Sequence, residues 1–258
     1  MTVQYLEGAE PLFIEGSNTG YLLLHGAGGG TTWDLKEFAE NLHSKTGATI
    51  WLPALKGFGT RPEDLFGISF SDWMTDARDG IKKLQQNCVN ISVVGHSMGG
   101  ILALILALEY KEITAITTWA AALSVKSRLL SLLPLINKIP LIKNVIPEKF
   151  PRPAPVELKA KGWIGYDWIP TSLGFVILEG LKQVKQSLSN VTCPAFIIQG
   201  TADESVSYNS AQKIYDTVKS LKKELWYVEG APHLIMNDDL YKGELFTRTI
   251  AFLEECKY

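Results

Sequence analysis

The feature of this sequence that most restricts its fold is a serine between glycines where a strand is expected to turn into a helix. Residues 91–94 are mostly apolar and β-branched, and residues 98–108 are rich in leucine and alanine, which predicts a strand and then a helix. Between them, residues 95–99 read GHSMG and fit the pattern G-x-S-x-G. Such a sharp turn holds the serine in a strained backbone conformation with an exposed hydroxyl. We therefore predict that Ser97 is a nucleophile.

Apolar segments of strand length alternate with helical segments in both end portions of the chain. The other predicted strands are residues 21–25, 48–52, 113–119, 195–199 and 224–228, and the other predicted helices are residues 35–42, 70–84, 211–218 and 240–253. Strands that are apolar throughout and alternate with helices indicate a parallel sheet covered on both faces. We predict an α/β fold with a doubly wound, mostly parallel sheet, formed by residues 1–123 and 191–258. Ser71, just before Asp72, is the predicted N-cap of the helix at 70–84.

The middle of the chain, residues 124–190, does not follow this alternation. Its prolines stand at positions 134, 140, 147, 151, 153, 155 and 170. We predict a helical cap insertion over the end of the sheet. Its apolar side chains with helical spacing are Leu135, Ile136, Ile139 and Ile142, and over a shorter reach Trp163, Ile164, Trp168 and Ile169. Two interpretations of them remain open: burial of the cap against the sheet, or the lining of a pocket for an acyl chain.

Composition argues against several classes of protein. The 258 residues, 46 % of them hydrophobic, suffice for one globular domain with a large core. A net charge of −2 gives no basic surface for nucleic acid, and no apolar segment is long enough for a membrane anchor. The three cysteines form no CxxC pair and H-E-x-x-H is missing, so we expect neither disulfides nor a metal. The first residues lack the pattern of a signal peptide, and we expect a cytoplasmic protein.

A serine nucleophile needs a base, and histidine serves best near neutral pH. Of the four histidines, two lie in glycine-rich turns and His43 lies in a polar helical segment, where a surface position is expected. His233 follows the predicted strand at 224–228. It is the one histidine after Ser97. In α/β folds with a G-x-S-x-G turn, the catalytic serine, acid and histidine follow one another in this order along the chain. We predict that His233 is the base.

The acid is expected between the nucleophile and the base. Residues 200–206 (GTADESV) follow the predicted strand at 195–199, and Asp203 is the natural choice. A buried carboxylate there would fix the tautomer of the histidine and stabilise the imidazolium. Glu204 is the neighbouring alternative, whereas the acids after His233 are disfavoured by chain order.

A second glycine-rich turn, HGAGGG at residues 25–30, follows the first clear predicted strand. Acyl transfer through a tetrahedral intermediate needs two backbone N–H groups aimed at one point. One of them comes from the loop after this strand and the other from the residue after the nucleophile. We therefore predict that Ala27 and Met98 form the oxyanion hole. Without the G-x-S-x-G motif, a simple tight turn would be the preferred interpretation of this loop. A phosphate-binding loop is excluded because there is neither a Walker lysine nor G-x-G-x-x-G.

With these residues in place, the chain from about residue 18 onward resembles the α/β-hydrolase superfamily. It is most similar to bacterial and archaeal carboxylesterases and monoacylglycerol lipases with a small cap. The resemblance rests on LLLHG, GFGTRPEDL at 57–65, SDW at 71–73, GHSMGG and CPAFIIQGTADESV at 193–206. It implies that the cap forms part of a pocket for the acyl and alcohol groups. The chain departs from these relatives at Phe58, where histidine is common, and at Ala27, where an aromatic residue is usual and the acyl pocket would gain room.

The sequence thus predicts a serine carboxylic-ester hydrolase that acts on small-molecule esters with apolar acyl groups through an acyl-enzyme. No cofactor is expected for this chemistry. Two alternatives remain: another acyl hydrolase, acting on thioesters, lactones or peptides, or a non-catalytic ligand-binding protein on the same fold. The acyl length, the alcohol and the oligomeric state are not indicated by the sequence.

Overall fold

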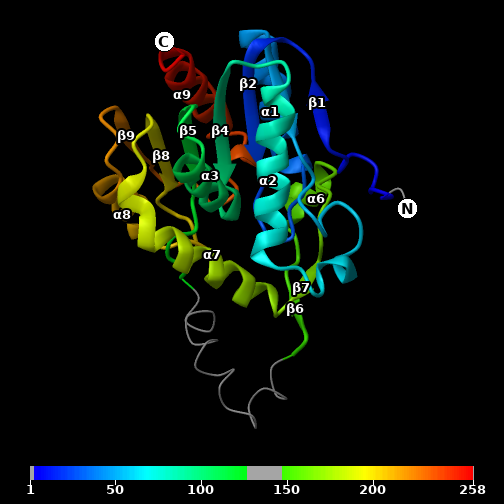
Figure 1. Cartoon of the computed structure of the whole chain (residues 1–258). Coiled ribbons are helices and arrows are strands. Elements are labelled where there is room, and N and C mark those ends of the chain that lie inside the picture. Colours follow the sequence, from blue (N-terminus) through cyan, green and yellow to red (C-terminus); the bar gives the residue numbers. More distant parts are fainter. Residues whose placement is uncertain (1–2, 127–146, 258) are drawn as a thin grey trace.

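A computed structural model describes residues 3–126 and 147–257 of the chain. Its main sheet has seven strands in the order β1-β3-β2-β4-β5-β8-β9 within these residues (Figure 1). The strands are β1 (Leu12–Ile14), β2 (Ser17–Leu24), β3 (Ala48–Leu52), β4 (Asn90–His96), β5 (Ile113–Trp119), β8 (Ala195–Gly200) and β9 (Lys223–Val228). Only β1 runs antiparallel to its neighbour, and the other pairs are parallel. The predicted α/β fold with a mostly parallel sheet is confirmed.

Helices cover both faces of this sheet. They are α1 (Trp33–Thr46), α2 (Phe70–Gln85), α3 (Met98–Glu109), α8 (Asn209–Thr217) and α9 (Lys242–Glu255). Helices α1 and α9 pack on one face, where Phe38 and Phe246 contact Trp119 of β5. Helices α2, α3 and α8 pack on the other face, with Trp73 and Ile214 in the core there. Because both faces are covered, the strands need apolar side chains at successive positions.

Strand β2 shows how one apolar run serves both faces. Tyr21 and Leu23 lie in the core under α1 and α9, whereas Leu22 and Leu24 lie in the core under α2 and α3. All four side chains are fully buried. Successive side chains of a strand point to opposite faces, so a run without polar residues is what a central strand requires.

The segment between β5 and β8 adds no strand to the main sheet in the part that the structure describes. It contains β6 (Lys149–Pro151), α6 (Val156–Ala160), β7 (Trp168–Pro170), α7 (Leu173–Ser187) and the 3₁₀ turn η2 (Leu188–Asn190). Strands β6 and β7 pair antiparallel in a small sheet of their own. The segment thus contains the predicted helical structure together with a short two-stranded sheet. Proline is tolerated in this sheet because each strand has a free edge.

None of the predicted apolar cap positions that the structure describes lies in a helix. Trp163 and Ile164 lie in a loop and Trp168 and Ile169 lie in β7, so the helical interpretation of their spacing is wrong. The other predicted set, residues 135–142, lies outside the described residues. Helix α7 of the insertion packs against α3 (Figure 1).

The start of helix α2 corrects another prediction. Its N-cap is Ser69, whose hydroxyl accepts a hydrogen bond from the Asp72 N–H at 3.3 Å. The Asp72 carboxylate accepts one from the Ser69 N–H at 2.9 Å, which completes a capping box. Ser71 lies inside the first turn instead, since only a residue three positions before Asp72 can exchange both bonds.

No helix in the described part of the chain has both the length and the apolar character needed to cross a bilayer.

Candidate active site

Ser97 lies at the turn from β4 into α3 in a conformation that few residues with side chains adopt. Its φ is 54° and its ψ is −114°. A Cβ atom on Gly95 would overlap the carbonyl oxygen of Gly99, and one on Gly99 would overlap the carbonyl oxygen of Leu24. The close approach of β4, α3 and β2 therefore requires both glycines of the GHSMG motif.

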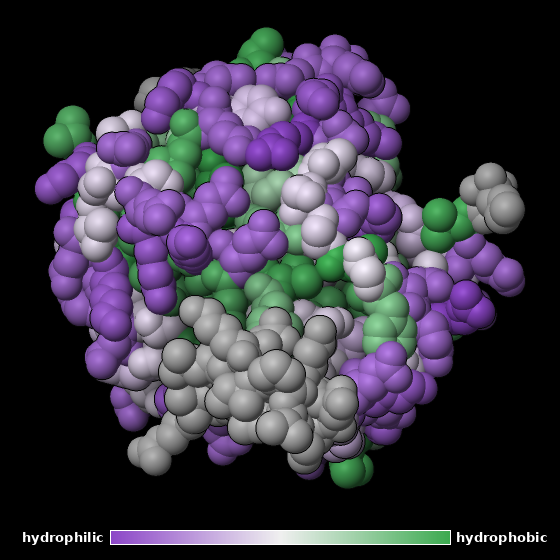
Figure 2. Space-filling model, turned by 60° about the horizontal axis from the view of Figure 1, so that its bottom comes forward, coloured by the Kyte–Doolittle hydropathy of each residue, from purple (hydrophilic) through white to green (hydrophobic). Residues whose placement is uncertain are grey.

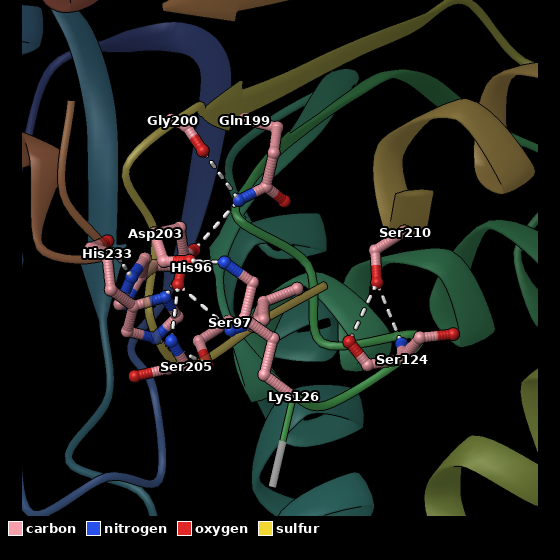
Figure 3. A network of polar contacts seen from close by, with 11 residues as sticks. His96, Ser97, Ser124, Lys126, Gln199, Gly200, Asp203, Ser205, Ser210 and His233 are labelled. Atoms are coloured by element: carbon pink, nitrogen blue, oxygen red, sulfur yellow. Dashed lines mark hydrogen bonds and ion pairs between the residues drawn. The ribbon is translucent and has the colours of Figure 1, made fainter. Parts of the chain in front are cut away.

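The structure brings the predicted nucleophile, base and acid together at the carboxyl end of the sheet (Figure 3). Nε2 of His233 lies 3.2 Å from Oγ of Ser97, and Nδ1 of His233 lies 2.8 Å from Oδ2 of Asp203. The three residues follow β4, β8 and β9, which are separated in sequence but end at the same edge. The Asp203 side chain is 1 % exposed and that of His233 is 15 % exposed. With the proton on Nδ1, Nε2 is free to accept the hydroxyl proton of Ser97.

The Asp203 carboxylate is held in a complete set of hydrogen bonds. Oδ1 accepts from the N–H groups of Ser205 and Val206 at 2.8 and 2.9 Å, and Oδ2 accepts from the Gln199 amide at 2.8 Å as well as from His233. Burial raises the pKa of Asp203, but the contact with His233 and the two backbone N–H groups outweigh it, so the net shift is downward. The carboxylate therefore stays charged and can stabilise a protonated His233.

The two predicted oxyanion donors lie on either side of Ser97. Ala27 lies in the loop after β2, and Met98 is the first residue of α3. Both are buried, and both line the cavity that contains Ser97. Neither backbone N–H has an acceptor among the described residues. The first N–H groups of a helix have no partner within the helix and favour negative charge nearby.

Two of the other histidines connect loops around this centre. His25 is fully buried, its Nδ1–H donates to the Gly26 carbonyl at 2.8 Å, and its Nε2 accepts from the Leu55 N–H at 3.1 Å. His96 Nε2 lies 3.0 Å from the carbonyl oxygen of His233, to which it donates in its neutral form. Burial lowers the pKa of His25 to about 4, and burial and the charge of His233 lower that of His96 to about 3. Both are therefore neutral near pH 7.

His43 is half-buried on α1, and the expectation of a surface position is only partly met. Its Nδ1 lies 2.8 Å from the carbonyl oxygen of Ala48, at the start of β3. It is a structural contact between α1 and β3, remote from Ser97.

A cavity of about 350 Å³ opens beside Ser97. Figure 2 shows apolar surface gathered in a hollow on this side of the molecule, with polar residues around it. Besides Ala27 and Met98, the apolar residues of its wall are Ala122, Val125, Phe150, Ile169, Pro170, Ile177 and Val206. The size lies within the range of small-molecule pockets, and the wall suits an apolar group. Of the four predicted cap positions that the structure describes, only Ile169 is in this wall.

Two charged residues of the cavity were not predicted from the sequence. Lys126 lines the cavity, and its ammonium group donates to the backbone carbonyl of Asp203 at 2.5 Å. Arg152, just after β6, also lines it. Arg152 lies in a proline-rich stretch without periodicity, so no pattern in the sequence pointed to it. Among the described residues, no group of three or more His, Cys, Asp or Glu side chains is placed to hold a metal ion.

Comparison with known proteins identifies the family. Residues 21–239 match the model of Hydrolase_4, described as serine aminopeptidase, S33. The chain belongs to this α/β-hydrolase family. It is 32 % identical over 240 residues to a thermostable monoacylglycerol lipase of Bacillus sp. (strain H-257), covering 92 % of each chain. It is 25 % identical over 230 residues to a carboxylesterase of Bacillus subtilis (strain 168), covering 89 % of this chain and 90 % of that one.

Solved structures agree with this family. One from a study of LipS and LipT, two metagenome-derived lipolytic enzymes, superposes with a TM-score of 0.86 at 28 % identity, covering 98 % of this chain and all (100 %) of the other. The monoacylglycerol lipase of Paleococcus ferrophilus superposes with a TM-score of 0.76 at 16 % identity, covering 95 % and 98 %. The latter likeness is one of fold alone.

Proposed function

We propose that this chain is a serine carboxylic-ester hydrolase and that monoacylglycerols are among its substrates. The observation that carries the proposal is the hydrogen-bonded series Ser97–His233–Asp203 at the wall of an apolar cavity. The relatives named monoacylglycerol lipase and carboxylesterase support the same class of reaction. A cytoplasmic location, and a role of residues 124–190 as a cap over the substrate, belong to this proposal.

The reaction proceeds through an acyl-enzyme. Oγ of Ser97 attacks the ester carbonyl carbon while Nε2 of His233 takes the hydroxyl proton. The negative charge on the carbonyl oxygen is held by the N–H groups of Ala27 and Met98. When the intermediate collapses, the bond to the alcohol oxygen breaks, and His233 returns its proton to that oxygen. Water, deprotonated by His233, then attacks the acyl carbon and releases the carboxylic acid and Ser97.

The cavity assigns the two parts of the substrate to different places. The apolar wall formed by β7, α7 and neighbouring residues suits the acyl chain. The alcohol leaves on the side of His233, since its oxygen must receive a proton from that ring. The small side chain of Ala27 leaves more room near the carbonyl carbon than an aromatic side chain would. The backbone N–H of Ala27 is present whatever the side chain.

The test is hydrolysis of p-nitrophenyl esters of short, medium and long acyl chains, and of monoacylglycerols, by wild type and by Ser97→Ala. We expect turnover by wild type and a loss in kcat on the order of 10⁴–10⁶ in the variant. Ser44→Ala is the matched control, because Ser44 is exposed on α1, remote from the cavity. Labelling of Ser97 by a fluorophosphonate without ester turnover would point to a thioester, lactone or peptide hydrolase. Absence of both labelling and turnover would favour a ligand-binding protein.

A further inference from the structure

Two hollows of the molecule meet at His233. His233 lines both the apolar cavity described above and a wider, more polar groove. Both are bordered by Arg152, Glu204, Ser205 and His233. If the acyl chain occupies the apolar cavity, the alcohol must lie next to His233, because this ring protonates its oxygen. The part of the alcohol beyond the ester oxygen therefore lies against Arg152 and Glu204.

Arg152 is an unusual arginine in this protein. The others that the structure describes each pair with a carboxylate: Arg61 with Asp64, Arg78 with Glu109, and Arg248 with Glu244. Arg152 has no ion pair within 4.0 Å among the described residues, and residues 127–146 contain no Asp or Glu.

The surroundings of the guanidinium group are confined. A Cβ atom on Gly28, next to Ala27, would lie 2.7 Å from Nη2 of Arg152. The group is half-buried there, and burial lowers its pKa. The backbone N–H of Arg152 donates to the Asp167 carbonyl at 2.7 Å, which fixes the start of the side chain. A desolvated guanidinium without a carboxylate partner has hydrogen-bond donors to offer to a ligand.

Glu204 supplies the complementary chemistry. It directly follows Asp203, borders both hollows, and forms no ion pair among the residues that the structure describes. Its carboxylate only accepts hydrogen bonds, whereas the Arg152 guanidinium only donates them. A hydroxyl group can do both, so an alcohol with further hydroxyls can satisfy both side chains. An alkyl alcohol offers neither side chain a hydrogen-bond partner and displaces water from them.

We propose that Arg152 and Glu204 form the subsite for the alcohol portion and select polyol esters, such as those of glycerol, over esters of plain alkyl alcohols. This rests on the proposed function and adds to it the residues that discriminate between alcohols. The selectivity is a difference between two substrates, so it is measured as a ratio of kcat/KM values.

The experiment compares 1-decanoylglycerol with propyl decanoate, which has the same acyl chain and carbon skeleton but lacks both free hydroxyls. Wild type is expected to prefer the glycerol ester, and Arg152→Met and Glu204→Gln are each expected to lower the preference about tenfold or more. Arg152→Lys, which keeps a donor, should recover part of it. Both rates come from one sample of enzyme, so the ratio does not depend on the folded fraction.

Matched controls are Arg248→Met and Glu244→Gln, which remove the same groups from an exposed pair on α9 and should leave the ratio at the wild-type value. The inference is overturned if wild type hydrolyses propyl decanoate as well as 1-decanoylglycerol, or if the Arg152 and Glu204 variants lose equal factors on both esters. In either case the ester-hydrolase proposal stands. If wild type hydrolyses neither ester, the proposed function itself is overturned, and this inference with it.

Discussion

Asp34 offers a quantitative test of how burial affects a charge in this fold. It lies in the first turn of α1 and is 3 % exposed. Its Oδ1 accepts hydrogen bonds from the indole N–H of Trp163 at 2.9 Å and from the side-chain amide of Asn237 at 3.0 Å. Burial raises the pKa of Asp34 from 3.8 to about 7, although both hydrogen bonds act in the opposite direction. Asp34 thus connects the insertion, α1 and the loop after His233.

The sign of the effect on stability follows from proton linkage. A carboxyl group whose pKa is higher in the folded state binds its proton more tightly there than in the unfolded chain. The contribution of Asp34 therefore favours the folded state most at pH values below about 4. This advantage is lost as the pH rises towards 7, and it changes little above that. A gap of about three pKa units corresponds to at most about 4 kcal/mol at 1.36 kcal/mol per unit, with relaxation around the charge reducing it.

Asp34→Asn isolates this contribution. The asparagine keeps an oxygen that can accept from Trp163 and Asn237, but it cannot ionise. We expect its free energy of unfolding, minus that of wild type, to rise by roughly 2–4 kcal/mol between about pH 4 and pH 8. Urea unfolding of both proteins across this range measures the difference, in which the other titrating groups cancel.

A difference that is independent of pH would refute the reasoning, because it would mean that Asp34 has the same pKa in the folded and unfolded chains. Trp163→Phe gives a second check. It removes a hydrogen bond that lowers the pKa of Asp34, so the pH at which the fall in stability ends should move upward.

Three further predictions concern the site and the frame around it. Asp203→Asn should lower kcat by about 10⁴ with little change in KM, measured on p-nitrophenyl esters, because the tautomer of the base is no longer fixed. Gly99→Ala should abolish cooperative thermal unfolding because its Cβ overlaps the Leu24 carbonyl, whereas Gly243→Ala, with nothing within 4 Å, should keep or raise the Tm. Ser69→Ala should cost about 1 kcal/mol in urea unfolding by removing the cap of α2.

The sheet could be predicted because its signal is local. Strands covered on both faces are apolar at every position, and β3 and β5 are found at the residues that the sequence predicted. Strand β1 was missed because it has only three residues, two of them half-buried, and pairs at the edge of the sheet. So short a segment carries no periodicity, and its pairing with β3 is set by the tertiary structure.

The grouping of Ser97, Asp203 and His233 could be predicted for a related reason. In a parallel sheet the loops after successive strands meet at one edge, so chain order and strand ends suffice to choose Ser97, Asp203 and His233 as candidates. The choice of Asp203 over Glu204 also has a physical basis in the structure. Asp203 is buried and accepts the N–H groups of the following turn, which a carboxylate one residue later does not.

The surroundings of the triad could not be found in this way. Arg152 and Glu204 are separated along the chain by α6, β7, α7, η2 and β8. Arg152 lies near the loop that contains Gly28 because β6 pairs with β7 and the Tyr166 N–H donates to the Gly29 carbonyl. From the sequence, Asp34 likewise resembles an ordinary acidic residue in the first turn of a helix, where a negative charge interacts favourably with the helix dipole. In the folded chain it is buried and hydrogen-bonded to Trp163 of the insertion and to Asn237, neither of which is near it in the sequence. The reaction type is therefore encoded in motifs at the ends of strands, whereas substrate selection depends on side chains that meet only after the insertion has packed against the sheet.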